Sequence, residues 1–296
     1  MGLPSSDGSG RAHPPAPSRL REGEVSDNLR TATNLLTGIS DTPRLDAELL
    51  LAHALGVERQ AMLLDPARFV VPDHFTNLVA RRMNHEPVAY ILGYREFWSL
   101  RIEVGPGVLI PRPDSETLIE AAMDHFRAAP PKTILDLGTG PGTLLLAALS
   151  EFPDATGLGV DASPDAMLYA RDNAEDLGMA DRVTLRQGDW GARVDGQFDL
   201  ILCNPPYIAD GEVLMPDVAD HEPTGALFAG ADGLDDYRRI IPDLPRLLAP
   251  GGAAVLEIGA RQRISVTALA EAAGFAVECR RDLGGRDRAL ILTAKP

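Results

Sequence analysis

Cysteine is scarce in this sequence, with only Cys203 and Cys279 among 296 residues. Two cysteines are too few for a disulfide framework, and they lack the spacing of a metal site. Long apolar runs are also missing: none approaches the ~20 residues that span a bilayer. Residues 1–17 contain no apolar segment of the kind that secretory signals carry. We therefore expect a cytoplasmic protein with no bound metal and no membrane partner.

Positive charge is in short supply as well. Lys and Arg number 28 against 43 Asp and Glu, which gives a formal net charge of -15. Such a chain repels a nucleic-acid backbone unless its charges are strongly segregated, so we expect no direct nucleic-acid binding. A protein partner is compatible with this charge. The chain is longer than a typical domain of ~100–200 residues, so two domains are the default expectation.

The hydrophobic pattern changes along the chain and suggests domain boundaries. Residues 1–25 are predicted to be a disordered tail, because Gly, Ser and Pro dominate its first part. Residues 26–94 show helical spacing and predict a small helical domain, with Thr42 and Pro43 opening one helix and Gly56 ending it. Residues 95–112 predict a β-hairpin linker whose turn falls at 105–107, with a return strand over 108–110.

Residues 113–296 alternate between short apolar segments and helical patterns. Such alternation implies a mostly parallel, doubly wound α/β sheet. A helix is expected after Pro113, capped by Asp114 or Ser115. Strands are predicted at 134–137, 158–161, 183–185, 198–203, 253–258, 276–280 and 289–293.

A glycine-rich turn follows the first of these strands and opens a helix. Its spacing is G-x-G-x-G, which differs from the dinucleotide fingerprint G-x-G-x-x-G and from a P-loop. Alone, this turn is as compatible with a tight bend as with a nucleotide site. As a cofactor-binding loop it would consist of Gly138, Thr139, Gly140, Pro141 and Gly142.

Acidic residues follow the next two strands, and they favour a nucleotide-binding site over a simple tight bend. Asp161 lies about 20 residues after the loop, where a carboxylate can bind both ribose hydroxyls; it could instead help to cap the helix that begins at Ser163. Asp189 and Trp190 end the third strand and could frame an adenine, although Trp190 is equally compatible with a core position. A nucleoside site without a pyrophosphate loop fits S-adenosylmethionine better than NAD.

The fourth strand, residues 198–203, is followed by Asn204-Pro205-Pro206-Tyr207. Asn offers one carbonyl acceptor and two N–H donors. The prolines lack N–H groups and leave nearby carbonyls free to accept hydrogen bonds, and Tyr adds a flat face. The tetrapeptide could therefore hold a planar –NH2 group. In isolation, the motif favours a turn residue before a Pro-Pro strand stop; at a strand end beside a nucleoside site, it favours a functional Asn204.

These motifs in this order resemble the class I methyltransferases that act on planar amino or amide nitrogens. Four further segments, 87–93, 96–98, 106–116 and 221–223, are similar to the HemK/PrmC family of peptide chain release factor N5-glutamine methyltransferases. The resemblance covers residues 26–296. It implies a class I S-adenosylmethionine-dependent methyltransferase fold, Rossmann-like with an antiparallel last strand. A small all-helical domain and a β-hairpin linker would precede it.

The resemblance also implies a reaction. A methyl group passes from S-adenosyl-L-methionine, which leaves as S-adenosyl-L-homocysteine, to the glutamine amide of a release factor's Gly-Gly-Gln motif. Asn204, which also borders the cofactor, and the Pro205 carbonyl would accept the two amide N–H bonds, Pro206 would line the substrate slot, and Tyr207 would pack on the amide plane. The helical domain would recognise the release factor, and the enzyme would act as a monomer.

A second function remains open at this stage. The N-P-P-Y motif also occurs in adenine-N6 methyltransferases, so the chain could be a nucleic-acid amino methyltransferase. That function predicts a basic recognition domain, whereas this chain totals -15 and has no basic run.

Overall fold

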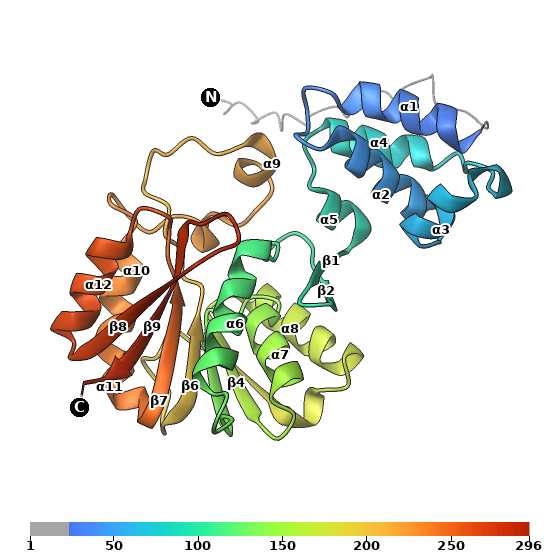
Figure 1. Ribbon diagram of the computed structural model, residues 1–296. Helices are drawn as coiled ribbons and strands as arrows, with labels where there is room; N and C mark the ends of the chain where they lie inside the picture. Colours follow the sequence, from blue (N-terminus) through green and yellow to red (C-terminus); the bar gives the residue numbers. More distant parts are fainter. Residues whose placement is uncertain (1–23, 296) are drawn as a thin grey trace, which may run out of the picture. The chain divides into compact units, whose positions relative to one another are not determined.

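The computed structural model describes residues 24–295, which form two compact units that meet in sequence between Leu92 and Gly93 (Figure 1). The predicted disordered tail, residues 1–25, lies outside the described residues except for its last two positions.

The N-terminal unit is helical, as its periodicity predicts, and the first strand of the described chain begins only at Tyr94. Helix α2 begins at Pro43 and ends at Leu55, and Gly56 follows as its C-cap with a left-handed φ of 65° that suits glycine. Thr42 occupies the N-cap position, as predicted, but its side chain makes no capping hydrogen bond; the hydroxyl donates to the Asp46 carboxylate at 3.0 Å. The helices are α1 (Val25–Leu36), α2 (Pro43–Leu55), α3 (Arg59–Leu64), α4 (Phe75–Met83) and α5 (Val88–Leu92), with a 3-10 turn, η1 (Pro66–Arg68).

This unit has its own apolar core and one buried ion pair. Its helices bury large side chains such as Leu29, Leu50 and Phe75 against one another. Within the unit, the Arg82 guanidinium lies 2.8 Å from the Asp46 carboxylate, and both side chains are less than a tenth exposed. Separate cores are typical of units that fold around their own hydrophobic residues.

The hairpin occurs, but its turn differs from the prediction. Trp98 and Ser99 form the hairpin turn, with φ of 52° and 60°. Bulky residues seldom adopt such φ values. Here hydrogen bonds hold Trp98: its backbone N–H donates to Glu116 at 2.9 Å and its indole to Glu151 at 2.6 Å. Residues 105–108 do form a turn, closed by the Val108 N–H donating to the Gly105 carbonyl at 3.3 Å, but residues 108–110 form no return strand, so the hairpin is not the one predicted. The strands are β1 (Tyr94–Phe97) and β2 (Leu100–Glu103).

The C-terminal unit contains a seven-stranded sheet in the order β5-β4-β3-β6-β7-β9-β8. All neighbours are parallel except the pairs that include β9, the last strand of the chain. The predicted doubly wound sheet with an antiparallel last strand is therefore confirmed. Its strands are β3 (Thr133–Leu137), β4 (Thr156–Asp161), β5 (Val183–Gln187), β6 (Phe198–Cys203), β7 (Leu248–Glu257), β8 (Phe275–Arg281) and β9 (Asp287–Ala294).

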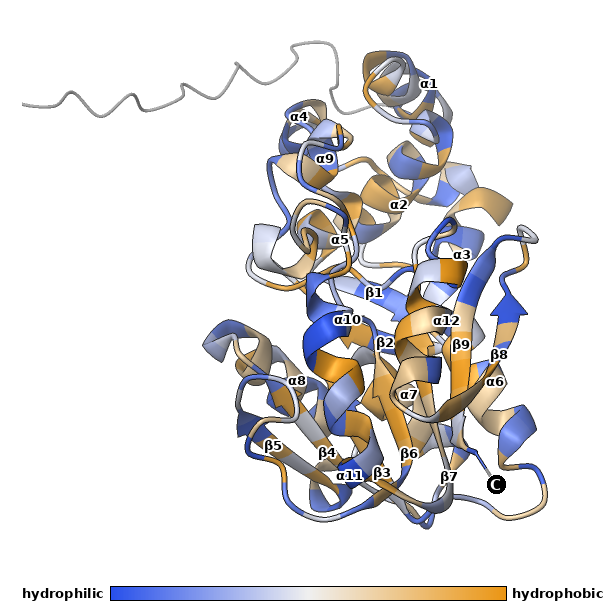
Figure 2. Cartoon of the chain, turned by 90° about the vertical axis from the view of Figure 1, so that its left-hand side faces the viewer, coloured by the Kyte–Doolittle hydropathy of each residue, from blue (hydrophilic) through white to orange (hydrophobic). Residues whose placement is uncertain are grey.

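Helices cover both faces of this sheet. Helices α6, α7 and α8 pack on one face, and α10, α11 and α12 on the other (Figure 1). The central strands are apolar on both sides, as buried parallel strands are (Figure 2). The helices are α6 (Glu116–His125), α7 (Thr143–Glu151), α8 (Pro164–Asp176), α9 (Pro216–Ala219), α10 (Asp235–Ile240), α11 (Leu244–Leu247) and α12 (Arg263–Ala272), and a 3-10 turn, η2 (Pro113–Ser115), precedes α6.

The strand order determines where ligands can bind. Strands β4, β3 and β6 are neighbours and run parallel, so their carboxyl ends lie at one edge of the sheet. In open α/β sheets this edge is the usual ligand-binding side. None of the helices in the described part of the chain combines the length and apolar character that crossing a membrane requires.

Replacing Asp46 with alanine is expected to destabilise the helical unit by about 3 kcal/mol, because the buried Arg82 guanidinium loses its carboxylate. The matched control Arg30→Ala removes an exposed ion pair and should change stability by less than about 0.5 kcal/mol. Native-state hydrogen exchange of the α2 and α4 amides measures both effects. Trp98 and Trp190 both lie in the other unit, so their fluorescence reports separately on that unit. Equal protection in the two variants would contradict the assignment.

Candidate active site

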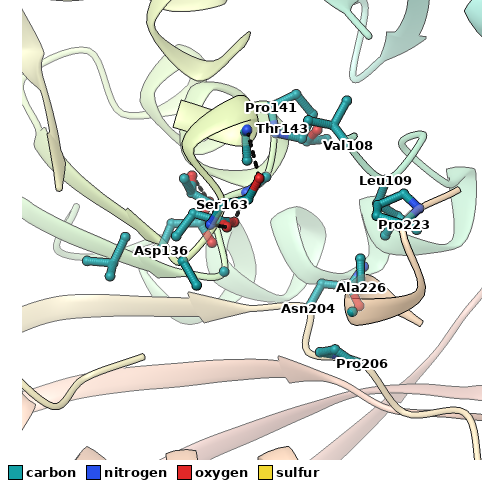
Figure 3. A pocket seen from close by; sticks show the side chains of 18 of the residues that line it. Val108, Leu109, Asp136, Pro141, Thr143, Ser163, Asn204, Pro206, Pro223 and Ala226 are labelled. Carbon is teal, nitrogen blue, oxygen red and sulfur yellow. Dashed lines mark hydrogen bonds between the residues drawn. The ribbon is translucent and has the colours of Figure 1, made fainter. Parts of the chain in front are cut away.

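A cavity of about 480 Å³ opens at the carboxyl edge of the sheet, within the C-terminal unit. This volume lies in the usual range of small-molecule sites, ~300–1,000 Å³. Asp136, Pro141 and Ser163 lie on one side of it, and Asn204 and Pro206 on the other (Figure 3). The sequence-predicted site residues that line it are Gly138, Thr139, Gly140, Pro141, Asp161, Asp189, Trp190, Asn204 and Pro206. Three predicted residues, Gly142, Pro205 and Tyr207, are adjacent in sequence but do not line it.

The glycine loop wraps around the end of β3. Gly138, Gly140 and Gly142 have φ of 73°, 55° and 87°, a conformation in which glycine avoids the strain of a side chain. The Asp161 carboxylate holds this loop, accepting from the Gly140 N–H and, with its other oxygen, from the Ser163 N–H, each at 2.8 Å. Asp161 thus joins the ends of β3 and β4. Its predicted contact with ribose hydroxyls stays a prediction.

Asp136, in β3, places a carboxylate beneath the same loop. One oxygen, Oδ2, accepts from the Thr139 hydroxyl at 2.7 Å and from the Leu145 N–H at 3.2 Å. Its other oxygen is the one buried side-chain polar atom in residues 24–295 without a hydrogen-bond partner. Burial raises the pKa of Asp136 to about 7. An unpaired carboxylate oxygen at a cavity wall suits a ligand that brings a positively charged hydrogen-bond donor.

Trp190 and Asp189 border the cavity at the end of β5. A Cβ atom on Gly138 would lie 2.8 Å from the Trp190 ring, so the indole packs directly on the glycine loop. The indole N–H donates to Asp236 at 3.1 Å, and Asp189 pairs with Arg239 at 2.5 Å. Asp236 and Arg239, both in α10, also line the cavity; no sequence motif marks them, so they are not among the predicted site residues.

Asn204 lies at the end of β6 and faces the cavity with its side-chain amide (Figure 3). Its Nδ2 donates to the Ser115 hydroxyl at 3.3 Å, and Ser115 donates to the Glu257 carboxylate at 2.6 Å. The Tyr207 hydroxyl donates to the other Glu257 oxygen at 3.4 Å. Burial raises the pKa of Glu257 to about 7. A buried carboxylate therefore lies directly behind the N-P-P-Y motif.

Neither Ser115 nor Glu257 was predicted as a site residue. Ser115, one of the two predicted cap residues, occupies the N-cap position of α6, but its hydroxyl makes no capping hydrogen bond and donates to Glu257 instead. Glu257 stands out in the sequence only as an acid that closes the apolar strand 253–258. An acid in a buried strand is uncommon without a partner, and that was the one signal available.

A further buried acid, Glu222, connects two segments at the rim of the cavity. Its carboxylate accepts from the Ile110 N–H at 3.2 Å and forms an ion pair with Arg112, which lines the cavity. The pair ties the loop after β6 to the segment before α6. The Glu222 side chain is 1% exposed, whereas the Arg112 side chain is 35% exposed, so the carboxylate is the buried partner of this ion pair.

Comparison with known families gives two matches. Residues 27–93 match the PrmC N-terminal domain, and residues 129–267 match a methyltransferase domain. A release factor glutamine methyltransferase of Rhodospirillum rubrum is 43% identical over 296 residues, covering 96% of this chain and 90% of that protein. Another of the same description, from Cereibacter sphaeroides, is 45% identical and covers 89% of this chain and 96% of its own length.

Solved structures agree on the fold. The catalytic domain of hMettl16, solved in complex with the MAT2A 3'UTR hairpin 6, superposes with a TM-score of 0.57 at 17% identity. The match covers 72% of this chain and 84% of that one. At this identity the likeness supports the methyltransferase fold alone.

Gly138→Ala is expected to raise the Kd for S-adenosylhomocysteine at least about tenfold, a loss of ~1.4 kcal/mol. The new methyl would meet the Trp190 ring at 2.8 Å, and the φ of 73° would be strained. The control Gly178→Ala has a similar φ of 68° with nothing within 4 Å, away from the cavity. Isothermal titration should give a wild-type Kd for this control. Wild-type affinity in Gly138→Ala would show that the loop does not hold the ligand.

Proposed function

This chain belongs to the family of release factor glutamine methyltransferases, and on that premise we propose that it methylates the N5 amide nitrogen of the Gly-Gly-Gln glutamine in peptide chain release factors. The observation that carries the proposal is the placement of Asn204. Its amide borders the same cavity as the glycine loop, so an acceptor nitrogen and a nucleoside donor can meet there.

The residues of the cavity fit S-adenosylmethionine. The Asp136 oxygen without a partner suits the ammonium of the methionine moiety, and open space lies beside Gly140, where a Cβ would meet nothing within 4 Å. Asp161, Asp189 and Trp190 would surround the nucleoside. When bound, this cofactor supplies an electrophilic methyl group, and it leaves as S-adenosylhomocysteine.

The protein's own contribution is to position a weak nucleophile. An amide lone pair is delocalised, so orientation matters more than a strong base. The Asn204 side-chain oxygen and the Pro205 carbonyl would accept the two N–H bonds of the glutamine. As positive charge grows on the nitrogen, these acceptors stabilise the transition state more than the ground state. Pro206 lines the cavity beside them.

Tyr207 does not line the cavity itself, and its ring would add a flat face at the border of this slot. Burial raises the pKa of its hydroxyl further above the usual range, so the phenol stays neutral. The hydroxyl donates to Glu257 and its backbone carbonyl accepts from Gln262 at 2.8 Å. These contacts hold the residue in place next to Pro206.

Asn204→Ala is expected to reduce the single-turnover methylation rate a few hundredfold, because loss of one preorganised partner costs on the order of 3 kcal/mol. Affinity for S-adenosylhomocysteine should stay within a few-fold of wild type. Asn34→Ala, at an exposed position of α1, is the matched control and should retain the full rate. A near-normal rate in Asn204→Ala would remove Asn204 from the mechanism.

The acceptor is identified by transfer of a labelled methyl group from S-adenosylmethionine. Label should enter a purified release factor and should disappear when the motif glutamine is replaced with glutamate, which has no –NH2 group. DNA and RNA serve as controls. Label on nucleic acid alone would favour the amino methyltransferase alternative.

The helical domain, residues 26–94 by the sequence boundaries, is proposed to recognise the release factor. Two features of this domain support the role. It has its own apolar core, and it carries two exposed apolar residues, Leu64 and Val70, with exposed fractions of 86% and 73%. Exposed apolar side chains on one module offer contact area to a protein partner.

The double variant Leu64→Asp, Val70→Asp is expected to raise the KM for an intact release factor about tenfold, as loss of ~1.4 kcal/mol of contact energy would. The rate with a short Gly-Gly-Gln peptide should stay unchanged. Leu283→Asp, at a fully exposed position of the other unit, is the control. An unchanged KM in the double variant would refute this assignment of the recognition surface.

A further inference from the structure

The amide of Asn204 has to be held one particular way round. An asparagine side chain offers an oxygen on one side and an –NH2 group on the other, and the two orientations have nearly the same shape. Only the oxygen can accept a hydrogen bond from a substrate –NH2 group. If the Asn204 amide group rotated by half a turn about its terminal bond, its own –NH2 group would face the substrate –NH2 group, and Asn204 would offer no acceptor.

We propose that Ser115 and Glu257 are positioning residues that hold the Asn204 amide with its oxygen toward the substrate. This inference rests on the proposed function for its substrate. Ser115, from η2, and Asn204, from the end of β6, both line the cavity, whereas Glu257, from the end of β7, does not. Their hydrogen bonds form one chain that leads from the cavity to the buried carboxylate.

The direction of that chain follows from proton counting. An ionised carboxylate can only accept, so Ser115 must give its single hydroxyl proton to Glu257, 2.6 Å away. The Ser115 oxygen then has only lone pairs left for Asn204. Asn204 must therefore present its –NH2 group, at 3.3 Å, and its oxygen points away from Ser115. The orientation of the amide thus depends on the charge of Glu257.

Several groups surround Glu257 and decide that charge. Its side chain is 1% exposed, and the Arg288 guanidinium of β9 lies 3.9 Å away. Burial is the largest influence and raises the pKa of Glu257 to about 7, whereas Ser115 and Arg288 lower it. The other polar or charged groups that face Glu257 are Tyr207 from the loop after β6, Tyr237 from α10, Cys203 from β6 and Asp114 from η2. Asp282 acts indirectly, because it pairs with Arg288.

Protonation would reverse the chain. A neutral Glu257 can donate to the Ser115 oxygen, which frees the Ser115 proton to point at Asn204. The Asn204 oxygen then becomes the better partner for Ser115, and the –NH2 group turns to the substrate. Since an acid protonates as the pH falls through its pKa, the productive orientation is expected above about 7 and lost below it.

The first test is single-turnover methylation of a release factor at saturating S-adenosylmethionine. Ser115→Ala and Glu257→Gln should each reduce the rate about tenfold. The first removes an orienting hydrogen bond of ~1.4 kcal/mol, and the second replaces a carboxylate that can only accept with an amide that can also donate to Ser115, as the protonated acid can. Ser115→Thr keeps the hydroxyl and should restore most of the rate. Ser150→Ala removes a hydroxyl that bonds only within α7 and should keep the full rate.

The pH dependence separates orientation from general damage. The wild-type rate should fall as the pH drops through about 7, whereas Ser115→Ala should be slow and independent of pH over that range. The pKa of Asp136 is also raised to about 7, so its titration could change cofactor binding over the same pH range. The affinity for S-adenosylhomocysteine is therefore measured at each pH, which separates an effect on binding from an effect on the methylation rate. Wild-type rates in both Ser115→Ala and Glu257→Gln would overturn the inference.

A second readout needs no substrate. The chain has six asparagines, so selective ¹⁵N labelling gives six side-chain –NH2 signals, and Asn204→Gln identifies the one from Asn204. That signal should shift as Glu257 titrates and should stop shifting in Ser115→Ala. If the chemical shift of this signal did not change with pH in the wild type, the proposed chain of hydrogen bonds would be refuted. Failure of the enzyme to methylate any release factor would refute the proposed function alone, because this readout would still test the chain.

Discussion

The shared edge of three parallel strands is the constraint on which the site depends. Strands β4, β3 and β6 are hydrogen-bonded neighbours, so Asp161, the glycine loop and Asn204 leave the sheet at the same level. Residues more than sixty positions apart in sequence therefore border one cavity. Rigid strands on both sides fix these groups more tightly than free loops would, which suits a reaction whose catalysis is mainly positioning.

Two buried carboxylates, Asp136 and Glu257, work against folding stability at this edge. Burial raises the pKa of each to about 7, so ionisation costs the folded state free energy at higher pH. Their placement explains why the cost is tolerated. Asp136 holds the glycine loop and keeps one oxygen for a ligand, whereas Glu257 fixes the hydrogen bonds behind Asn204.

The sequence predicts the parts of the site that follow one another along the chain. Apolar strands and the polar residues that end them are local patterns, so the α/β sheet, the glycine loop and Asn204 could be found. The hairpin turn could not, because the hydrogen bonds that hold Trp98 in it come from Glu116 and Glu151, which are distant in sequence. The partnership of Ser115 with Glu257 was equally hidden: it joins positions 142 residues apart and depends on strand order.

Position 204 carries an amide, and this explains why Ser115 and Glu257 are needed to orient it. A carboxylate there would accept hydrogen bonds in either orientation and would need no partner to orient it. Its charge, however, would attract a cationic cofactor before the reaction as strongly as during it, and uniform binding does not speed the chemical step. A neutral amide avoids that attraction but is ambiguous about which end it presents. Ser115 and Glu257 remove the ambiguity, and the only charge in this pair, that of Glu257, lies outside the cavity lining.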